Sequence, residues 1–517
     1  MAKKIFFLFF CLVSITAFGQ KNKLQVLSNE KIFGKNLLDS SEIKGFEYIF
    51  HDRIHEVFID TTTGFLTAQL RGVSKNGKWL DNKGNIIQYD LNNNNFLWSK
   101  KIAYQKSYLQ QFSNTMIYTT GNKSNFLDIY TGKELWTVKN NILFVDPIDK
   151  IGIGYKYKNS DDDIQGVDLN NGNVIWTREI DRDYGWNNVF YINDSTMIVV
   201  AAGLHAINIH NGDGWDYNTI TGEKDYSGTN AANAVGAVLG VFTGTFVLST
   251  GYNLVRDVVS NALVDSSYIY LASKTQLAKL DKETGYIIWK YLLPENLTSK
   301  SSIFMNDSTV FMINKGFAFM GSRQLNFGTP FIAAFDRQTG EQKYFSEMPV
   351  KKDPILDFEI LDNEIYIVFK NRIAKYSKET GNLTAEKEFP KDSYGELKYF
   401  LGDQIFVPDQ NGDLISLSQS DSGKVFVYTN QENTLSIDNQ LNVTNTIEYE
   451  NLNLYYLRTK EYKFIAKDKN TLIVNNEGKK IAEIEATSNA FMIKGILYDK
   501  QDNRFIAIDL NTLFKNE

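Results

Sequence analysis

The stretches DIYTGKELW (128–136), DLNNGNVIW (168–176) and DKETGYIIW (281–289) decide the fold of this chain. Each places Asp first, Gly fifth and Trp ninth. Two further copies keep the spacing with one exchange each: DLNNNNFLW (90–98) has Asn94 in the glycine position, and DRQTGEQKY (336–344) ends in Tyr344. A pattern that recurs at this spacing predicts a repeat architecture. Weaker copies are NTITGEKDY (218–226), SKETGNLTA (377–385), QSDSGKVFV (419–427) and VNNEGKKIA (474–482).

Each copy indicates a tight turn between two antiparallel strands. Gly supplies the positive φ that such a turn demands, and Asn is the next best residue. The Asp four residues earlier accepts hydrogen bonds from turn amides. The aromatic residue four positions after the glycine lies on the next strand, where we expect it to pack against the neighbouring repeat. The predicted turn residues are Asn94, Gly132, Gly172, Gly222, Gly285, Gly340 and Gly381, and the predicted docking aromatics are Trp98, Trp136, Trp176, Tyr226, Trp289 and Tyr344.

Between the turns, the chain has short runs rich in β-branched and aromatic residues. TMIYTTG (115–121), STMIVVAAG (195–203), SYIYLAS (267–273) and EIYIVFK (364–370) are typical of central strands. Where no insertion intervenes, successive copies of the turn lie about 38–42 residues apart, close to the roughly 40–45 residues of a four-stranded propeller blade. Larger intervals indicate insertions between or within blades.

The Asp-x-x-Thr-Gly-x-x-x-Trp pattern resembles the tryptophan-docking repeat of quinoprotein-type propellers. This family includes the PQQ-dependent alcohol dehydrogenases and the non-catalytic propeller of the outer-membrane protein assembly machinery. The resemblance covers about residues 54–510 and implies an all-β fold, a β-propeller of four-stranded blades. We expect about eight blades, within a range of seven to ten. The C-terminal stretch NRFIAIDLNTLF (503–514) needs a partner, so we expect N- and C-terminal strands to close the ring.

The N-terminus is typical of a signal peptide. Lys3 and Lys4 precede an apolar run, and Ala17-Phe18-Gly19 offers a cleavage site, so residues 1–19 are predicted to be removed. Residues 20–50 then form an N-terminal segment, and residues 51–517 form the propeller. Cys11 is the only cysteine, it follows Phe10, and it lies inside the predicted signal peptide, so we expect neither lipidation nor a thiol in the mature chain.

An insertion is predicted between blades at about residues 212–255. Its stretch AANAVGAVLGVFTGTFVLSTG (231–251) has no charge and repeats small residues at every fourth position. A helix of this length, about 31 Å, matches a bilayer core. Repeats on both sides must nevertheless join one ring, so we expect no true span. The insertion is predicted to pack on the propeller, bind a partner or touch a membrane, with Trp215, Gly236, Gly240 and Gly244 as candidate contact residues.

The sequence predicts an exported, non-catalytic module for binding or scaffolding in the periplasm, at the cell surface or outside the cell. A net charge of −6 without a basic stripe argues against nucleic acid as a partner. The resemblance implies that an enzyme would hold PQQ on a floor Trp beside calcium, commonly under a disulfide of adjacent cysteines, for which the mature chain has no cysteines. We therefore expect no catalytic, cofactor or metal residues, no PQQ and no calcium, and other envelope proteins or an unidentified ligand as partner. The alternatives are a PQQ-dependent oxidoreductase and a propeller attached to a membrane interface through residues 226–255.

The processing prediction has a direct test. The mature protein isolated from its own cell envelope should begin at Gln20 and carry no lipid, because Cys11 is removed with the signal peptide. Intact-mass measurement checks both points. A mass that includes Cys11 with acyl chains would contradict the prediction.

Overall fold

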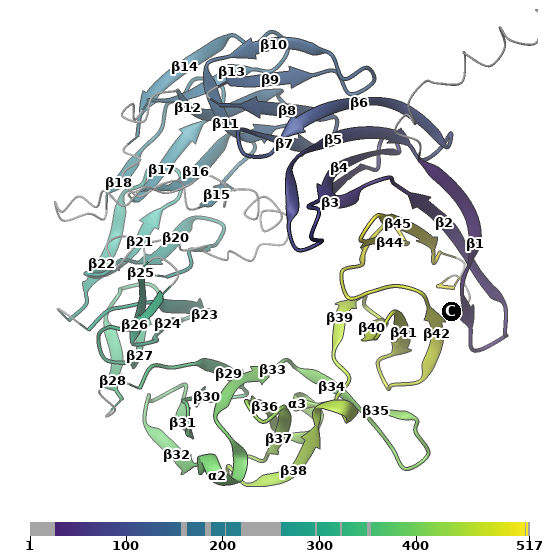
Figure 1. Cartoon of the computed structure of the whole chain (residues 1–517). Helices are drawn as coiled ribbons and strands as arrows, with labels where there is room; N and C mark the ends of the chain where they lie inside the picture. The colour runs from purple at the N-terminus through teal and green to yellow at the C-terminus, as the bar shows by residue number, and fades with distance from the viewer. Residues whose placement is uncertain are drawn as a thin grey trace, which may run out of the picture.

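The structure is a computed structural model that describes residues 26–121, 123–156, 163–180, 188–201, 203–218, 260–294, 297–320, 323–348, 353–511 and 513–514. The predicted signal peptide (1–19), Gly222, Tyr226, Gly236, Gly240 and Gly244 lie outside the described residues. The described strands are arranged as successive small sheets around a ring, with strands such as β15 (Asn188–Tyr191) toward its middle and β18 (Asp216–Asn218) at its outside (Figure 1). The predicted all-β propeller is confirmed.

Eight four-stranded sheets, here called units 1 to 8, follow one another along the chain. Unit 1 consists of β3 (Arg53–Asp60), β4 (Phe65–Val73), β5 (Leu80–Asp90) and β6 (Asn95–Ala103); unit 2 of β7 (Ser107–Phe112), β8 (Thr115–Thr120), β9 (Lys123–Leu127) and β10 (Glu134–Val138). Unit 3 consists of β11 (Asn140–Asp146), β12 (Ile151–Lys156), β13 (Asp163–Asp168) and β14 (Val174–Glu179); unit 4 of β15, β16 (Thr196–Ala201), β17 (Gly203–Asn208) and β18.

Units 5 to 8 continue the ring and carry two additional hairpins. Unit 5 consists of β19 (Leu263–Val264), β20 (Tyr268–Ala272), β21 (Gln276–Asp281) and β22 (Ile287–Leu292); unit 6 of β23 (Ser301–Met305), β24 (Thr309–Asn314), β27 (Phe331–Asp336) and β28 (Gln342–Glu347), with the hairpin β25 (Phe317–Met320) and β26 (Arg323–Asn326). Unit 7 consists of β29 (Asp357–Leu361), β30 (Glu364–Val368), β31 (Arg372–Ser377) and β32 (Leu383–Glu388); unit 8, after α2 (Lys391–Tyr394), of β33 (Leu397–Leu401), β36 (Val425–Thr429), β37 (Asn433–Ile437) and β38 (Val443–Glu448), with the hairpin β34 (Gln404–Pro408) and β35 (Leu414–Ser418) and the short helices α3 (Gln419–Ser422) and η2 (Tyr449–Asn451).

A nine-stranded sheet completes the ring. Its order is β39-β40-β41-β42-β1-β2-β45-β44-β43, which contains unit 9 (β39 to β42) and unit 10 (β43, β44, β45 and β2) with β1 between them. The strands are β39 (Tyr455–Arg458), β40 (Tyr462–Lys467), β41 (Asn470–Asn475), β42 (Lys480–Ile484), β43 (Phe491–Ile493), β44 (Ile496–Gln501), β45 (Arg504–Asp509), β1 (Leu27–Asn36) and β2 (Glu42–Ile49).

The N-terminal strands close the ring, as predicted. β2 pairs with the C-terminal strand β45 from Gly45↔Ile508 to Ile49↔Arg504, so it supplies the fourth strand of unit 10. β1 pairs along β2 and reaches β42 only through Gly34–Asn36. Arg504 bonds both Glu47 of β2 and Glu485 beside β42, at 2.5 and 2.8 Å, and so holds units 9 and 10 together at this junction. The ring therefore begins with β1, and residues 27–49 belong to it rather than to a separate N-terminal segment.

Apolar layers between successive units form the core. Ile117 of unit 2, for example, packs with Ile142 and Val167 of unit 3. At the closure, Tyr498 and Phe505 of unit 10 pack with residues of unit 1 such as Leu66. Because each sheet has a neighbour on both faces, its central strand is buried on both faces rather than alternating: every residue of β24 is buried.

The structure contains ten four-stranded units among the described residues, at the upper end of the predicted range and above the preferred count of eight. One of the weak copies, QSDSGKVFV (419–427), does not form the turn between the third and fourth strands of its unit. Gly423 ends α3 before β36, whereas the turn of unit 8 has Leu441 at φ 64° and contains no glycine at that position. Unit 10 has no turn between its third and fourth strands, because its fourth strand comes from the other end of the chain.

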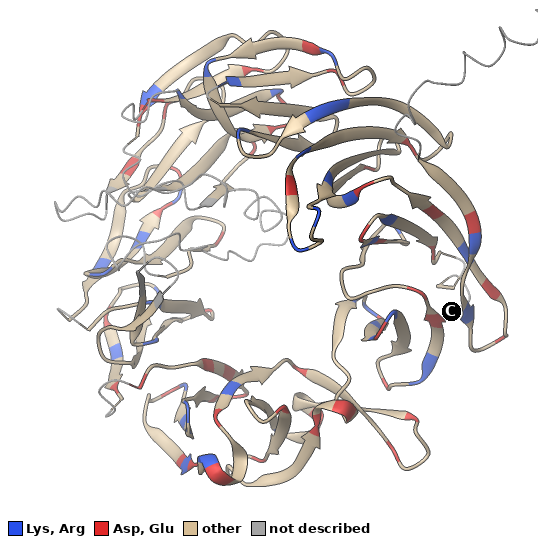
Figure 2. Cartoon of the chain, viewed as in Figure 1, with Lys and Arg blue, Asp and Glu red and all other residues tan. Residues whose placement is uncertain are grey.

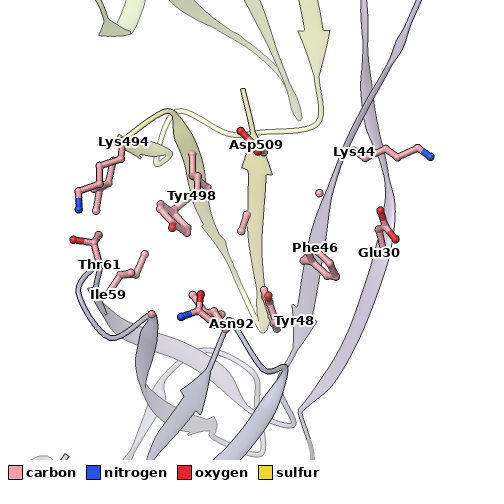
Figure 3. A pocket seen from close by; sticks show the side chains of 16 residues that line it. Glu30, Lys44, Phe46, Tyr48, Ile59, Thr61, Asn92, Lys494, Tyr498 and Asp509 are labelled. Atoms are coloured by element: carbon pink, nitrogen blue, oxygen red, sulfur yellow. The ribbon is translucent and has the colours of Figure 1, made fainter. Parts of the chain in front are cut away.

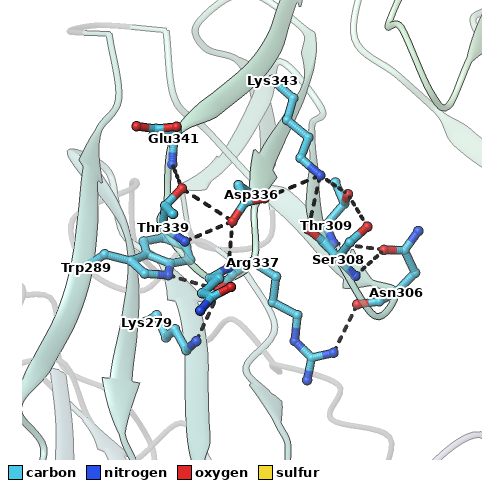
Figure 4. A network of polar contacts seen from close by, with 11 residues as sticks. Lys279, Trp289, Asn306, Ser308, Thr309, Asp336, Arg337, Thr339, Glu341 and Lys343 are labelled. Atoms are coloured by element: carbon cyan, nitrogen blue, oxygen red, sulfur yellow. Dashed lines mark hydrogen bonds and ion pairs between the residues drawn. The ribbon is translucent and has the colours of Figure 1, made fainter.

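Six consecutive interfaces between neighbouring units, here called seams, are each stabilised by the same kind of contact. The ring N–H or O–H of an aromatic residue in one unit donates to a backbone carbonyl in the turn of the next unit. The donor and acceptor residues are Trp98 and Ile129 (2.9 Å), Trp136 and Leu169 (2.8 Å), Trp176 and Ile209 (2.7 Å), Trp215 and Lys282 (3.2 Å), Trp289 and Arg337 (3.1 Å), and Tyr344 and Lys378 (2.9 Å). Figure 4 shows Trp289 against the turn from Asp336 to Glu341.

Each docked ring also covers the turn glycine of the next unit. A Cβ atom at Gly132 would lie 2.6 Å from the indole of Trp98, so the glycine is required by space as well as by its φ of 68°. Gly172, Gly212, Gly285, Gly340 and Gly381 are covered in the same way. The Asp, Asn or Ser four residues before each glycine closes the turn: in unit 5, hydrogen bonds from the Thr284 side chain and from turn amides lower the pKa of Asp281.

The structure corrects the prediction for unit 4. Trp215 does not lie in an insertion; it is the docking aromatic of this unit, and Gly212 is its turn residue with φ 79°. The pairing of β17 with β18 has no register shift, whereas the corresponding pair in unit 3 shifts between Gly166 and Val167. Unit 4 is therefore one residue shorter between its turn and its aromatic, and the sequence pattern missed it. The remaining predicted contacts of the insertion lie outside the described residues.

The docking contacts predict a stability series. Trp136→Ala and Trp215→Ala should each destabilise the fold by about 3–5 kcal/mol, because each removes a ring that fills a seam. Trp79→Ala should have little effect, since that side chain is 73% exposed. Thermal and urea unfolding measure the three variants. If Trp215→Ala melts with the parent while Trp136→Ala does not, the docking role of Trp215 is wrong.

Candidate functional site

The seam between unit 10 and unit 1 departs from the repeated contact. In unit 5, Lys279 pairs with the docking Trp289 and lies two residues before the turn residue Asp281. In unit 10, Ala507 pairs with Phe46 and lies two residues before Asp509. Phe46 therefore occupies the position of the docking aromatic at the ring closure.

Phe46 does not make the docking contact. It has no ring N–H, and its side chain is 42% exposed. The acceptor that corresponds to Ile129 or Arg337 is the carbonyl of Leu91, which follows Asp90, and it accepts no hydrogen bond from the described residues. The turn of unit 1 has Asn94 at φ 54° where the other docked turns have glycine. A Cβ atom at this position stands where a docked ring would lie, which keeps Phe46 off the turn.

A cavity of about 460 Å³ lies at this seam, here called the closure slot. Its walls come from the face of unit 10 and from two turns of unit 1 (Figure 3). Tyr48 and Tyr498, 3% and 6% exposed, form the aromatic wall, and burial raises the pKa of both phenols. The lining residues are Glu30, Lys44, Gly45, Phe46, Tyr48, Ile59, Thr61, Gly64, Leu91, Asn92, Ile493, Lys494, Ile496, Tyr498, Ala507 and Asp509.

The charged groups of the closure slot lie in two places, the β1–β2 ladder and the end of unit 10. Lys44 and Glu30 come from the β1–β2 ladder, and Lys494 and Asp509 from the end of unit 10 (Figure 3). Two cations and two anions balance, so the lining has no net preference for a charged ligand. The hydroxyls of Tyr48 and Tyr498 make no hydrogen bond with the described residues. A concave, aromatic-walled space with few polar groups has the chemistry of a binding site rather than of an acid–base centre.

A second cavity, of about 390 Å³, lies at the seam of units 5 and 6. Here the docking ring is present, and the Lys279 ammonium and the Trp289 indole both donate to the Arg337 carbonyl at 3.1 Å (Figure 4). The Arg337 guanidinium in turn bonds Asp265 at 2.7 Å and the Tyr270 hydroxyl at 3.1 Å. The cations of this cavity are engaged by internal partners, so its polar network stabilises the seam.

Two lysines lie close together on unit 6. The Lys315 amide donates to the Lys300 carbonyl at the start of β23. Burial, together with the charge of Lys315, lowers the pKa of Lys300 to about 8. Burial also lowers the pKa of Lys315, while the Asp357 carboxylate of unit 7 opposes that shift. Burial thus favours the neutral form of both amines relative to a solvent-exposed lysine.

Sequence reasoning missed a histidine–carboxylate pair in unit 4. His205 Nδ1 lies 2.6 Å from Asp216 Oδ1, and the Arg178 guanidinium donates to the same oxygen at 2.6 Å. Partial burial raises the pKa of Asp216, but the hydrogen bonds to His205 and Arg178 lower it by more. The net shift of the pKa is therefore downward. The pair arises because His205 and Asp216 face each other on neighbouring strands. In the sequence, the only sign of this arrangement is that the aromatic residue of unit 4 follows its turn glycine one residue earlier than in the other units, which places Asp216 on a strand.

The other predicted aromatic and turn residues that the structure describes form the contacts between units. Trp98, Trp136, Trp176, Trp289 and Tyr344 lie at the docking contacts, and Gly132, Gly172, Gly285, Gly340 and Gly381 lie under them. Among the described residues, no group of three or more His, Cys, Asp or Glu is placed to hold a metal ion. In the same part of the chain, no helix is both long enough and apolar enough for a membrane crossing. Basic and acidic residues are interspersed along the strands and turns of the ring (Figure 2).

The fold and its docking contacts define a β-propeller with PQQ-like repeats. The family model described as outer membrane protein assembly factor BamB matches residues 66–291 and 253–512, and the chain belongs to this family. No curated protein matches the sequence.

Similar solved structures include BamB from Moraxella catarrhalis, with 13% identity and a TM-score of 0.30 over 78% of this chain and 94% of that chain. They also include quinohemoprotein alcohol dehydrogenase from Comamonas testosteroni, with 12% identity and a TM-score of 0.34 over 70% of this chain and 73% of that chain. At these values, neither similarity carries an argument about the site.

The lowered pKa of Lys300 predicts a dependence of stability on pH. Between about pH 8 and 10.5 the folded state has lost a proton that the unfolded state retains, so this group makes the protein more stable as pH rises. Lys300→Met should therefore raise the urea midpoint at pH 7.5 and flatten its increase toward pH 9.5. Lys133→Met, at an exposed turn, is the control and should follow the parent. Parallel curves for the parent and Lys300→Met would contradict the prediction.

Proposed function

We propose that the chain is an exported, non-catalytic propeller that binds another protein of the cell envelope. The observation that carries the proposal is the closure slot. Six seams of the ring are pinned by the chain's own aromatic rings, whereas this one is an open cavity with an exposed Phe46 beside it. Membership of the BamB family and the N-terminal sequence support a location in the envelope.

The positions of the described tryptophans support a role without a cofactor. Five of the seven tryptophans dock between units, and Trp79 is a solvent-exposed residue near the start of β5. Their rings are therefore committed to holding the propeller together. Trp186 lies outside the described residues.

Site-specific photo-crosslinking in cells tests the proposal. A photoreactive residue in place of Lys44, at the closure slot, should give adducts with envelope proteins, because a bound partner covers this position. The same residue in place of Ile148, which is 87% exposed on unit 3, is the control and should give few adducts. Equal labelling at the two positions would contradict the proposal.

A second measurement separates binding from catalysis. The purified protein with added PQQ and calcium should not reduce a dye with alcohols or sugars as substrates. Dye reduction that depends on both additions would replace the proposed function by an oxidoreductase.

A further inference from the structure

We propose that the closure slot binds a tryptophan side chain presented by a partner polypeptide, with the indole N–H donating to the Leu91 carbonyl. This inference rests on the proposed function and names the chemistry of the partner. The chain itself shows which rings such a turn accepts, because the corresponding glycine-containing turns of units 2 to 7 each receive an aromatic ring from the preceding unit. Five of those six rings are indoles.

The acceptor is already in place. At each docked seam, the accepting carbonyl belongs to the residue after the Asp, Asn or Ser that opens the turn. Leu91 holds this position in unit 1, and the Asp90 carboxylate closes its turn by accepting the amides of Asn92 and Asn93 at 3.0 Å. The Leu91 amide is fixed by the Gly64 carbonyl. The turn and its carbonyl acceptor are therefore formed in advance.

The slot has room for a ring from outside. Its volume of about 460 Å³ lies within the usual range of small-ligand sites, about 300–1,000 Å³. Asn94, held by a 2.8 Å hydrogen bond from the Tyr89 hydroxyl, occupies the place that the internal rings use over glycine. An incoming indole must therefore lie beside Asn92 and Gly64, which line the slot. There it faces the rings of Phe46 and Tyr498, and such aromatic neighbours favour edge or offset contacts.

The Leu91 carbonyl selects indole over a hydrocarbon ring. A phenyl ring in the slot would cover this carbonyl and leave it without a donor, which costs binding free energy. An indole satisfies it. The four charged side chains of the lining balance in sign, so the ring rather than a charge sets the preference.

The test uses N-acetyl-5-fluoro-tryptophanamide as the probe, followed by ¹⁹F NMR on the whole protein. The parent should bind it with a Kd of about 1 mM or below, as a ligand of this size allows. N-acetyl-phenylalaninamide should compete about tenfold more weakly, because it leaves the carbonyl unpaired. Absence of probe binding up to about 10 mM, or equal binding of the two amides, would overturn the proposal.

The double variant Phe46→Trp/Asn94→Gly rebuilds the internal docking pair and is expected to fill the slot. It should raise the melting temperature and weaken probe binding at least tenfold. Ile148→Trp, at an exposed position of unit 3, is the control and should bind like the parent. Ala507→Leu provides a second filled slot, so the conclusion does not depend on the folding of one variant. Unchanged binding in both filled variants would overturn the proposal.

The outcome separates this inference from the proposed function. Crosslinks at position 44 without probe binding leave the function standing and reject the indole. Probe binding without crosslinks supports the slot chemistry and rejects the envelope partner.

Discussion

The ring depends on the contact between an aromatic side chain of one unit and the glycine turn of the next. The aromatic side chain fills the gap between two twisted sheets. Its N–H or O–H donates a hydrogen bond to a backbone carbonyl that would otherwise be buried without a donor. The glycine is needed because a Cβ atom would meet the ring. One contact thus couples three sequence requirements, the Asp that closes the turn, the Gly beneath the ring and the aromatic residue on the next strand. This coupling makes the repeat visible in the sequence.

Closure imposes a second constraint. The C-terminal part of the chain supplies only three strands of the last unit, so its fourth strand comes from the start of the chain. β2 is this strand and pairs with β45, and β1 extends the sheet to β42. The strand that closes the ring comes from outside the repeat, and it carries Phe46 where the repeat would place Trp. The closure slot is therefore a consequence of closing the ring with a strand of different origin, and the open carbonyl of Leu91 gives that slot its chemistry.

The sequence predicted the fold class and the closure well, and the site poorly. Docking residues such as Trp136 and turn residues such as Gly172 follow a fixed spacing, so a linear pattern finds them. Trp215 was assigned to an insertion because unit 4 is one residue shorter, and a fixed spacing cannot register a missing bulge. The turn of unit 8 was missed because Leu441 adopts positive φ without being glycine. Asn94 was recognised as a turn residue, but no local pattern explains why this turn has Asn instead of glycine.

The sequence by itself determined many of the turns and strands and showed that units dock on their neighbours through an aromatic residue, because these are interactions between neighbours along the repeat. Only the tertiary structure decided how many units close the ring, which strand completes the last one and where a docking position stays open. Those properties depend on pairing between the two ends of the chain, Phe46 with Ala507, some 460 residues apart in the sequence. No local pattern reports such a pairing, because its register is set by the packing of the whole ring.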